Sequence, residues 1–534
     1  MPRLLLALLL LSPAFVAAAE SSPRLVLLVS VDQLRRDRLD ARLPGGLGRL
    51  AREGRVHLEG ALDHALTETC AGHATMLTGR HPGAAGIPGN SFIDAKAGQS
   101  VYCVSDPAED ARVIGAEQGR SPRNLRVTTL GDWMKAARPE TRVFSVSGKD
   151  RAAIAMGGQH PDAAYWFNRT GAVGFTTSRY YRESLPDWVA GFNAGFLDGL
   201  PETWAHALDG APPPPPPRPD DYAGESPDYS RTTPHPLRDG DPEQFADNLY
   251  FTPYLDEITL KFATELVAKE KLGERGGADL LAVSLSAGDG VGHLYGPGSH
   301  EARDALLRLD RALGEFLGFL EARLGEGELL VALTSDHGVL PLPEWLEETG
   351  ANRCPVAGSR VGMRRLGLGL AWELHRTFTP IVALPKDWVV FAGSQIGVSR
   401  PVASEQGVEV GAILAAVERY LEAEPSIAQA WTAEELEQSD SEIARLYRNS
   451  RDPERSGDLL VQLEPTCLVS PYDYGTSHGS PYLYDRAVPI LFWGAGIAPA
   501  RVEGPAATVD IAPTLARHLG LEPPPDLDGR SLVD

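Results

Sequence analysis

Residues 24–32 read Arg24-Leu-Val-Leu-Leu-Val-Ser-Val-Asp32, an apolar run of strand length that ends directly in a carboxylate. A short, nearly continuous apolar run is typical of a strand buried on both faces of a parallel sheet. Similar runs recur further along the chain, and several are followed at once by polar side chains. The further strand candidates are residues 141–146, 279–285, 328–334 and 488–493.

Helix-like stretches alternate with these runs. In residues 301–324 one helical face collects six large apolar side chains, and such a face packs against a core. They are Leu306, Leu307, Leu309, Leu313, Phe316 and Leu320. This alternation predicts an α/β fold with a mostly parallel central sheet and helices on both faces. At 534 residues, we expect one large domain with insertions, or two domains.

Polar residues lie just beyond the ends of the predicted strands, where ligands bind in open α/β sheets. Asp32, Lys149, Asp289 and Asp336 each follow such a run, and His293 comes four residues after Asp289. Mixed carboxylate and imidazole ligands suit zinc and similar divalent metals. Six groups of this kind suffice for two ions with open positions, so the sequence predicts a two-metal hydrolase. The six are Asp32, Asp289, His293, Asp336, His337 and His478.

A hydroxyl group is supplied by the segment that contains Thr69. Small residues and Gly72 follow Thr69 in a helix-compatible run, so backbone amides at a helix start could approach an anion there. A threonine hydroxyl is a poor nucleophile unless a metal or a base lowers its pKa. Alone, Thr69 would be interpreted as a helix cap. Beside a full set of metal ligands, it becomes a candidate nucleophile.

These motifs together resemble the alkaline phosphatase superfamily, in particular exported bacterial phosphatases with a threonine nucleophile. The resemblance runs from Val-Ser-Val-Asp32 to residues 508–515 and implies the superfamily's α/β core with capping insertions. It implies one zinc held by Asp32, Thr69, Asp336 and His337, and a second held by Asp289, His293 and His478. It also implies phosphate contacts from Asn90, Lys149 and Arg151, which fit the charge that a transferring phosphoryl group carries.

The implied function is zinc-dependent hydrolysis of small phosphate monoesters through a phosphothreonine at Thr69. A phosphodiesterase or nucleotide pyrophosphatase would share the ligands, but Lys149 and Arg151 favour a doubly charged monoester. A sulfatase would need proline and arginine where this chain has Ala71 and His73. A binding protein without turnover stays open as an alternative. We interpret His73 as a brace for the loop, and four other histidines as structural: His57, His64, His81 and His160.

The first 19 residues have a cationic start, a short leucine-rich run and small residues before Glu20, which predicts a secretory signal, with a membrane anchor as the alternative. We therefore expect a periplasmic or secreted protein. A net charge of −22 argues against binding to a nucleic-acid backbone. Export favours disulfides among the four cysteines. Three pairings are open, with a weak preference for Cys70–Cys103 and Cys354–Cys467, and free thiols stay an alternative.

Two stretches interrupt the α/β pattern and are expected to be insertions in a catalytic domain that spans residues 20–534. Residues 175–245 contain six consecutive prolines, Pro212 to Pro217, and would cap the sheet. Residues 340–475 would form a small α/β subdomain with a helix at 411–422 and a strand at 458–463. Both could contact the leaving group of the substrate. Tyr165, Trp166 and Phe167 are candidates for lining an entrance, and the oligomeric state is left open.

Overall fold

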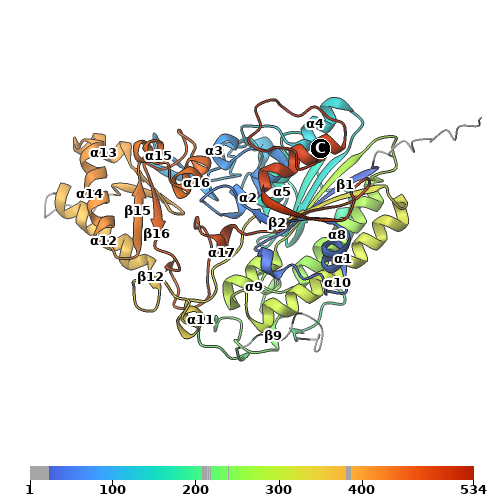
Figure 1. Cartoon of the computed structure of the whole chain (residues 1–534), viewed down its shortest axis with the longest axis horizontal. Coiled ribbons are helices and arrows are strands. Elements are labelled where there is room, and N and C mark those ends of the chain that lie inside the picture. Colours follow the sequence, from blue (N-terminus) through green and yellow to red (C-terminus); the bar gives the residue numbers. More distant parts are fainter. Residues whose placement is uncertain are drawn as a thin grey trace, which may run out of the picture.

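The computed structural model describes residues 23–206, 213, 216, 218–238, 240–379 and 387–533. The predicted signal segment and most of the six-proline run lie outside these residues. A nine-stranded sheet runs through the centre of the larger part of the molecule (Figure 1). Its order is β19 (Ala500–Ala507), β2 (Arg55–Ala61), β18 (Ile490–Gly494), β11 (Leu329–Thr334), β1 (Leu25–Val31), β10 (Asp279–Leu285), β5 (Val143–Ser147), β6 (Ala163–Asn168) and β7 (Gly174–Thr176).

The sheet is mostly parallel, as the sequence predicts. Strands β11, β1, β10, β5 and β6 are neighbours and run in the same direction. β18 is the exception among the predicted strands, because it pairs antiparallel with both β11 and β2. The carboxyl ends of the parallel strands share one edge, so the residues that follow β11, β1, β10 and β5 are brought next to one another.

Alternate residues of β1 point to two different cores. Leu25, Leu27 and Val29 pack on the face covered by α1 (Gly46–Glu53), α8 (Tyr254–Glu270) and α10 (His300–Leu324). Val26 and Leu28 pack on the opposite face, against α2 (Thr69–Thr78), α4 (Leu130–Ala137) and α18 (Ile511–His518). Figure 1 shows helices on both sides of the sheet. None of the helices in the described ranges has the length and apolar character needed to cross a bilayer.

The aromatic run at residues 165–167 does not line an entrance, so that prediction is wrong. Tyr165, Trp166 and Phe167 form the middle of β6 and are 0–3% exposed. Because side chains alternate along a strand, Tyr165 and Phe167 join the core under α8, whereas Trp166 packs on the other face with Ile154. Three consecutive aromatic residues here belong to a strand that is buried on both faces.

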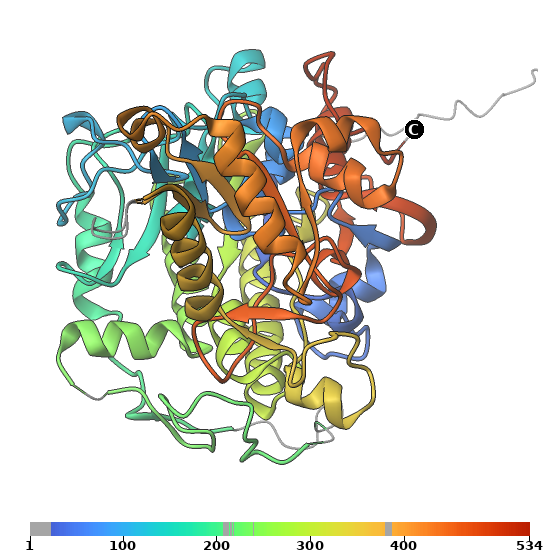
Figure 2. The same cartoon turned by 90° about the vertical axis from the view of Figure 1, so that its left-hand side faces the viewer.

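Residues 340–475 contain a second sheet with a core of its own. Its order is β13 (Val389–Ala392), β14 (Gln395–Val398), β16 (Leu459–Leu463) and β15 (Ile427–Trp431). Helices α12 (Met363–Phe378) and α14 (Val410–Glu422) pack on it, on the side that faces the viewer in Figure 2. The helix and strand predicted in this segment are present as α14 and β16. Cys354 is bonded to Cys467, and Cys70 to Cys103, so the preferred pairing is confirmed.

The described parts of residues 175–245 lie over the helical layer that contains α8 and α10. They include α6 (Asp187–Gly195), β8 (Thr203–Trp204) and β9 (His235–Pro236), and α7 (Pro242–Tyr250) follows. Val189, Trp204 and Leu237 are fully buried in the core beneath the α8 and α10 face. β8 and β9 pair with each other and not with the large sheet.

Candidate metal centre and nucleophile

Three carboxylates meet at the shared edge of the sheet. Asp32 follows β1, Asp289 lies in α9 (Ala287–Tyr295) after β10, and Asp336 follows β11. All three are at most 3% exposed. Lys149 follows β5, and its Nζ lies between two of the carboxylates, in contact with Asp32 Oδ2 and 2.6 Å from Asp289 Oδ2. The topology therefore brings these four predicted residues together.

Three histidines join the carboxylates. His293 lies one helical turn after Asp289, with Nε2 3.1 Å from Asp289 Oδ1, and His478 Nε2 is 3.7 Å from the same oxygen. His337 Nε2 is 3.3 Å from Asp336 Oδ2 and 3.5 Å from Asp32 Oδ1. The ligand atoms form two trios that share His337, namely Asp32, Asp336 and His337, and Asp289, His337 and His478. His337 thus lies between the two predicted ligand sets, and its ring stacks on that of His478.

The hydrogen bonds of these rings fix which nitrogen can bind a metal. Nδ1 of His293 is 2.8 Å from the Thr476 carbonyl oxygen, and Nδ1 of His478 is 2.7 Å from that of Thr67. His337 makes the same contact with the carbonyl of Gly338, at 3.0 Å. A carbonyl only accepts, so Nδ1 carries the proton in each ring. Nε2 is then the nitrogen of each ring that can offer a lone pair to a metal, the arrangement that metal-binding histidines generally have.

The residues present fit a bound divalent cation. Asp32 Oδ1, Asp336 Oδ2 and His337 Nε2 are buried and have no hydrogen-bond partner within the described ranges. Burial, and then the charge of Asp336, raises the pKa of Asp32 well above its usual value. Burial acts in the same direction on Asp289, but the charges of His293 and Lys149 outweigh it and lower the pKa of that carboxyl. Three buried carboxylates exceed what one ammonium can neutralise, and bound metal ions would supply the missing positive charge.

Thr69 is the first residue of α2, so its hydroxyl lies at a helix N-terminus. Arg151 Nη2 is 3.3 Å from Thr69 Oγ1. The backbone N–H of Cys70 donates to Asn90 Oδ1 at 2.9 Å, which leaves the amide NH₂ of Asn90 as its donor. Gly72 holds this turn against the metal ligands, because a Cβ there would lie 2.2 Å from the backbone oxygen of Asp336.

His73 braces the turn that carries Thr69, as predicted. Its Nδ1 is 2.8 Å from the Thr69 carbonyl oxygen and its Nε2 is 2.9 Å from Ser284 Oγ in β10. The same Nδ1 is 3.3 Å from Asp336 Oδ2, so the ring links the turn that carries Thr69 to a candidate ligand carboxylate. The remaining histidines that we interpret as structural belong to no cluster of metal-binding groups within the described ranges: His57, His64, His81 and His160.

A cavity of about 700 Å³ opens over this centre. On the side of the large sheet it is lined by Thr69, Asn90, Arg151, Asp289, His293 and His478. Its opposite wall comes from residues 340–475 and includes Met363, Leu366 and Phe391. No described residue of 175–245 lines it, so the expectation that both insertions reach the leaving group is wrong for the described part of that segment, which packs on the α8 and α10 face. Lys149 does not line the cavity either.

Two residues of the centre have no counterpart in the sequence predictions. Gln33 takes a left-handed backbone conformation, φ 67°, and its Nε2 donates to Asp289 Oδ1 at 2.7 Å. Its backbone N–H points to Asp336 Oδ1 at 3.3 Å, so Gln33 links two candidate ligand carboxylates. Glu68 accepts a hydrogen bond from the backbone N–H of Asn90 at 2.6 Å. The only sequence signal for Gln33 and Glu68 is that each is adjacent to a candidate site residue.

Asp256, in α8, supports α9 from beneath and gives a pH prediction. Its Oδ1 accepts from the N–H of Ala287 at 2.9 Å, and burial raises its pKa to about 7. The folded state therefore binds a proton that the unfolded chain has released, and stability falls as pH rises from about 4 to about 7. Asp256→Asn removes this pH-dependent loss of stability, because asparagine does not titrate. We expect the free energy of unfolding of the variant, relative to that of the parent protein, to be a few kcal/mol higher at pH 9 than at pH 5.

Urea unfolding of both proteins at the two pH values measures this gain. The difference in free energy of unfolding between variant and parent is taken at each pH. Comparing the values at pH 5 and pH 9 cancels the pH-independent cost of changing the side chain. The same difference between variant and parent at pH 5 and at pH 9 would show that Asp256 does not titrate in this way.

Comparisons with known proteins agree with this geometry. The family model of type I phosphodiesterase / nucleotide pyrophosphatase matches residues 26–481. The alkaline phosphatase PhoK of Sphingomonas sp. is 34% identical over 96% of this chain and 91% of PhoK. The alkaline phosphatase PafA of Elizabethkingia meningoseptica is 30% identical over 96% of this chain and 94% of PafA.

Solved structures share the fold. The crystal structure of wild-type PafA has a TM-score of 0.87 and 29% identity, covering 96% of this chain and 98% of that one. Murine ectonucleotide pyrophosphatase / phosphodiesterase 5, at 15% identity and a TM-score of 0.51, shares the fold over 94% of this chain and 96% of its own. The chain belongs to the type I phosphodiesterase / nucleotide pyrophosphatase family, within the alkaline phosphatase superfamily.

Proposed function

We propose that the protein is an exported, zinc-dependent alkaline phosphatase that hydrolyses small phosphate monoesters through a phosphothreonine at Thr69. Phosphatase activity is supported by relatives named alkaline phosphatases that match nearly the whole chain. The proposal goes further in four respects: the preference for monoesters, the zinc ions, the covalent intermediate and export by residues 1–19. In this scheme residues 175–245 and 340–475 are insertions in one catalytic domain.

One observation carries the proposal. The hydroxyl of Thr69 lies at a helix N-terminus in a cavity that also exposes Asp289, His293 and His478, with a guanidinium 3.3 Å from its oxygen. A nucleophile, a positive charge for phosphate oxygens and metal ligands therefore border the same space. A phosphorylated side chain at this position would be surrounded by the groups that phosphoryl transfer requires.

Asp32, Thr69, Asp336 and His337 would hold one zinc, and Asp289, His293 and His478 would hold the other. Bound zinc would supply Lewis acidity that makes a hydroxyl or a water molecule nucleophilic near neutral pH. Thr69 Oγ1 then forms the bond to phosphorus while the bond to the leaving oxygen breaks and the alcohol departs. Water attacks the phosphothreonine in the second half, releases phosphate and restores the threonine.

The cations of α5 (Asp150–Gly157) and its N-cap bind the substrate's charge. Arg151 is half-buried in the wall of the cavity, and its planar guanidinium can pair with two phosphate oxygens at once. Lys149 Nζ pairs with Asp32 and Asp289. Metal ions bound by these two carboxylates would compete with the ammonium and turn it toward the phosphate.

The balance of charge favours monoesters over diesters. A monoester carries two negative charges to meet Lys149 and Arg151, whereas a diester carries one. The family also contains phosphodiesterases, and a cavity of about 700 Å³ has room for a second ester group, so diester hydrolysis is the alternative. The zinc-loaded protein is expected to hydrolyse p-nitrophenyl phosphate much faster than bis(p-nitrophenyl) phosphate or p-nitrophenyl sulfate. A preference for the diester would replace the monoesterase with the alternative.

Removing the positive charges of Lys149 and Arg151 tests whether these two side chains cause the preference for monoesters. The double variant Lys149→Gln, Arg151→Gln is expected to lose roughly 100-fold more kcat/KM on the monoester than on the diester, because charge-assisted contacts to the extra phosphate oxygen disappear. Lys135→Gln, which removes a cation paired with Asp162 away from the cavity, is the matched control. Equal losses on both substrates would mean that the two cations have no selective role.

A further inference from the structure

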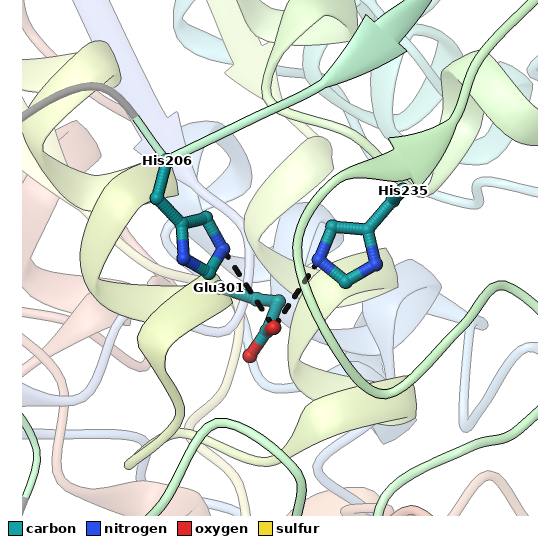
Figure 3. Close-up of side chains that lie close together, drawn as sticks. All are labelled: His206, His235 and Glu301. Atoms are coloured by element: carbon teal, nitrogen blue, oxygen red, sulfur yellow. Dashed lines mark ion pairs between the residues drawn. The ribbon is translucent and has the colours of Figure 1, made fainter.

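A second cluster of metal-binding groups lies outside the cavity. His206 follows β8, His235 lies in β9, and Glu301 is in the first turn of α10. Figure 3 shows both rings directed at the Glu301 carboxylate. Nε2 of His235 is 3.2 Å and Nε2 of His206 is 3.6 Å from Glu301 Oε1. These three residues belong to neither trio at the active centre.

The carboxylate at the middle of this cluster is buried without hydrogen bonds. Glu301 is 0% exposed, and neither of its side-chain oxygens has a hydrogen-bond partner within the described ranges. Nε2 of His206 and Nε2 of His235 are also buried and have no hydrogen-bond partner among the described residues. A buried carboxylate left in this state costs several kcal/mol, so it is expected to pair with a cation or to coordinate a metal.

The hydrogen bond on the far side of His235 orients its lone pair toward Glu301. Nδ1 of His235 is 3.1 Å from the carbonyl oxygen of Tyr229, so Nδ1 carries the proton. In the neutral ring, Nε2 then presents a lone pair to a carboxylate oxygen 3.2 Å away, which is repulsive unless a cation lies between them. His293, His337 and His478 at the active centre use the same contact between Nδ1 and a carbonyl.

A proton on Nε2 of His235 would give a partner to only some of these buried atoms. It would pair with Oε1 of Glu301 and leave Oε2 and His206 Nε2 without partners. Glu225 Oε2 and Asp220 Oδ1 are also buried and unpartnered within the described ranges. The other oxygen of Glu225, Oε1, is paired with Arg218, whose Nη2 lies 2.7 Å away. Within the described residues, oxygens of more than one buried carboxylate thus lack a partner here, and a divalent ion supplies two charges at one point.

We propose that His206, His235 and Glu301 bind a third zinc ion, through Nε2 of each ring and the carboxylate. Two imidazoles and one carboxylate are a donor set that zinc favours and that calcium and magnesium, which prefer oxygen ligands, do not. His206 also belongs to a second trio with Asp220 and His300. The trio with Glu301 is the site, because its carboxylate is fully buried and has no hydrogen-bond partner among the described residues.

This zinc would fasten the segment around residues 203–238 to two helices of the catalytic core. Glu301 starts α10, and the hydroxyl of Tyr295, at the end of α9, is 3.2 Å from His235 Nδ1. The backbone N–H of Ser226 donates to the carbonyl of Leu294 at 2.9 Å, next to the proposed active-centre ligand His293. We therefore expect the ion to stabilise the fold on which the second zinc site is built, without contacting the substrate.

The zinc content of the purified protein tests the proposal. After saturation with Zn²⁺ and dialysis, elemental analysis is expected to find three zinc ions per chain in the parent protein and two in Glu301→Gln. The control His160→Asn, which changes an exposed histidine, should keep three. Asp289→Asn, which damages the active centre, should still hold zinc at the new site. A parent protein and a Glu301→Gln variant with equal zinc content would overturn the proposal.

A second measurement decides the matter if Glu301→Gln does not fold. Crystals of the zinc-loaded parent protein, measured at the zinc absorption edge, are expected to give an anomalous peak between Glu301 and the two imidazoles. Peaks at the active centre with none at this position would show that the cluster is an ion pair between a protonated histidine and Glu301, and the proposal would fail. The proposed phosphatase mechanism would be unaffected by that result.

Discussion

Thr69→Ala is expected to lower kcat for p-nitrophenyl phosphate at least about 1,000-fold, because the variant has no oxygen with which to form the covalent intermediate. Thr69 Oγ1 is the side-chain oxygen that lies beside the Arg151 guanidinium at the start of α2. The substitution leaves Asp32, Asp289, Asp336 and the histidines in place. Zinc binding should therefore decline much less than turnover, and steady-state kinetics with elemental analysis measure both.

Thr69→Ser is the matched variant for this experiment. Serine keeps the hydroxyl and loses only a methyl group, so it is expected to retain most of the activity. The near-ultraviolet circular dichroism of both variants should equal that of the parent protein, which separates chemistry from misfolding. An alanine variant as active as the serine variant would remove Thr69 from the role of nucleophile.

Asp289→Asn is expected to have the second largest effect, a loss of at least about 100-fold in kcat/KM at limiting zinc. Asp289 contacts Lys149, His293 and Gln33, and its lowered pKa keeps it ionised, as the proposed metal ligand must be. Asparagine preserves the size of the side chain but removes the negative charge that zinc requires. It also leaves Lys149 with one carboxylate partner instead of two.

Zinc titration of the metal-free protein measures this loss directly. Added zinc should restore part of the activity of Asp289→Asn, because the other ligands remain. Asp110→Asn, which changes an exposed carboxylate paired with Arg123, is the control and should bind and turn over like the parent. Unchanged zinc affinity in Asp289→Asn would exclude Asp289 as a metal ligand.

Much of the centre could be predicted from the sequence because its signals are local. Buried parallel strands appear as continuous apolar runs, and polar residues after such strands must meet at one edge of the sheet. This reasoning found Asp32, Asp289 and Asp336 without knowledge of the strand order. β10 has the predicted bounds, and β1 and β11 each begin one residue later than predicted.

Features that depend on tertiary contacts could not be predicted. An apolar run does not reveal strand direction, so the antiparallel pairing of β18 had no signal. The run Tyr165-Trp166-Phe167 has the same composition whether it lines an entrance or fills a buried strand. Gln33 is recognisable only through the two carboxylates that it links. The grouping of His206, His235 and Glu301 depends on where a turn-rich segment packs, which no local pattern specifies.

The proposal that Thr69 is the covalent nucleophile is tested most directly by trapping the intermediate. The zinc-loaded protein would be quenched in acid during turnover of p-nitrophenyl phosphate and digested, and the peptide that contains Thr69 would be weighed by mass spectrometry. We predict the added mass of one phosphoryl group on Thr69 in the parent protein and none in Thr69→Ala. A phosphoryl group on another residue, or none at all during rapid turnover, would contradict the account.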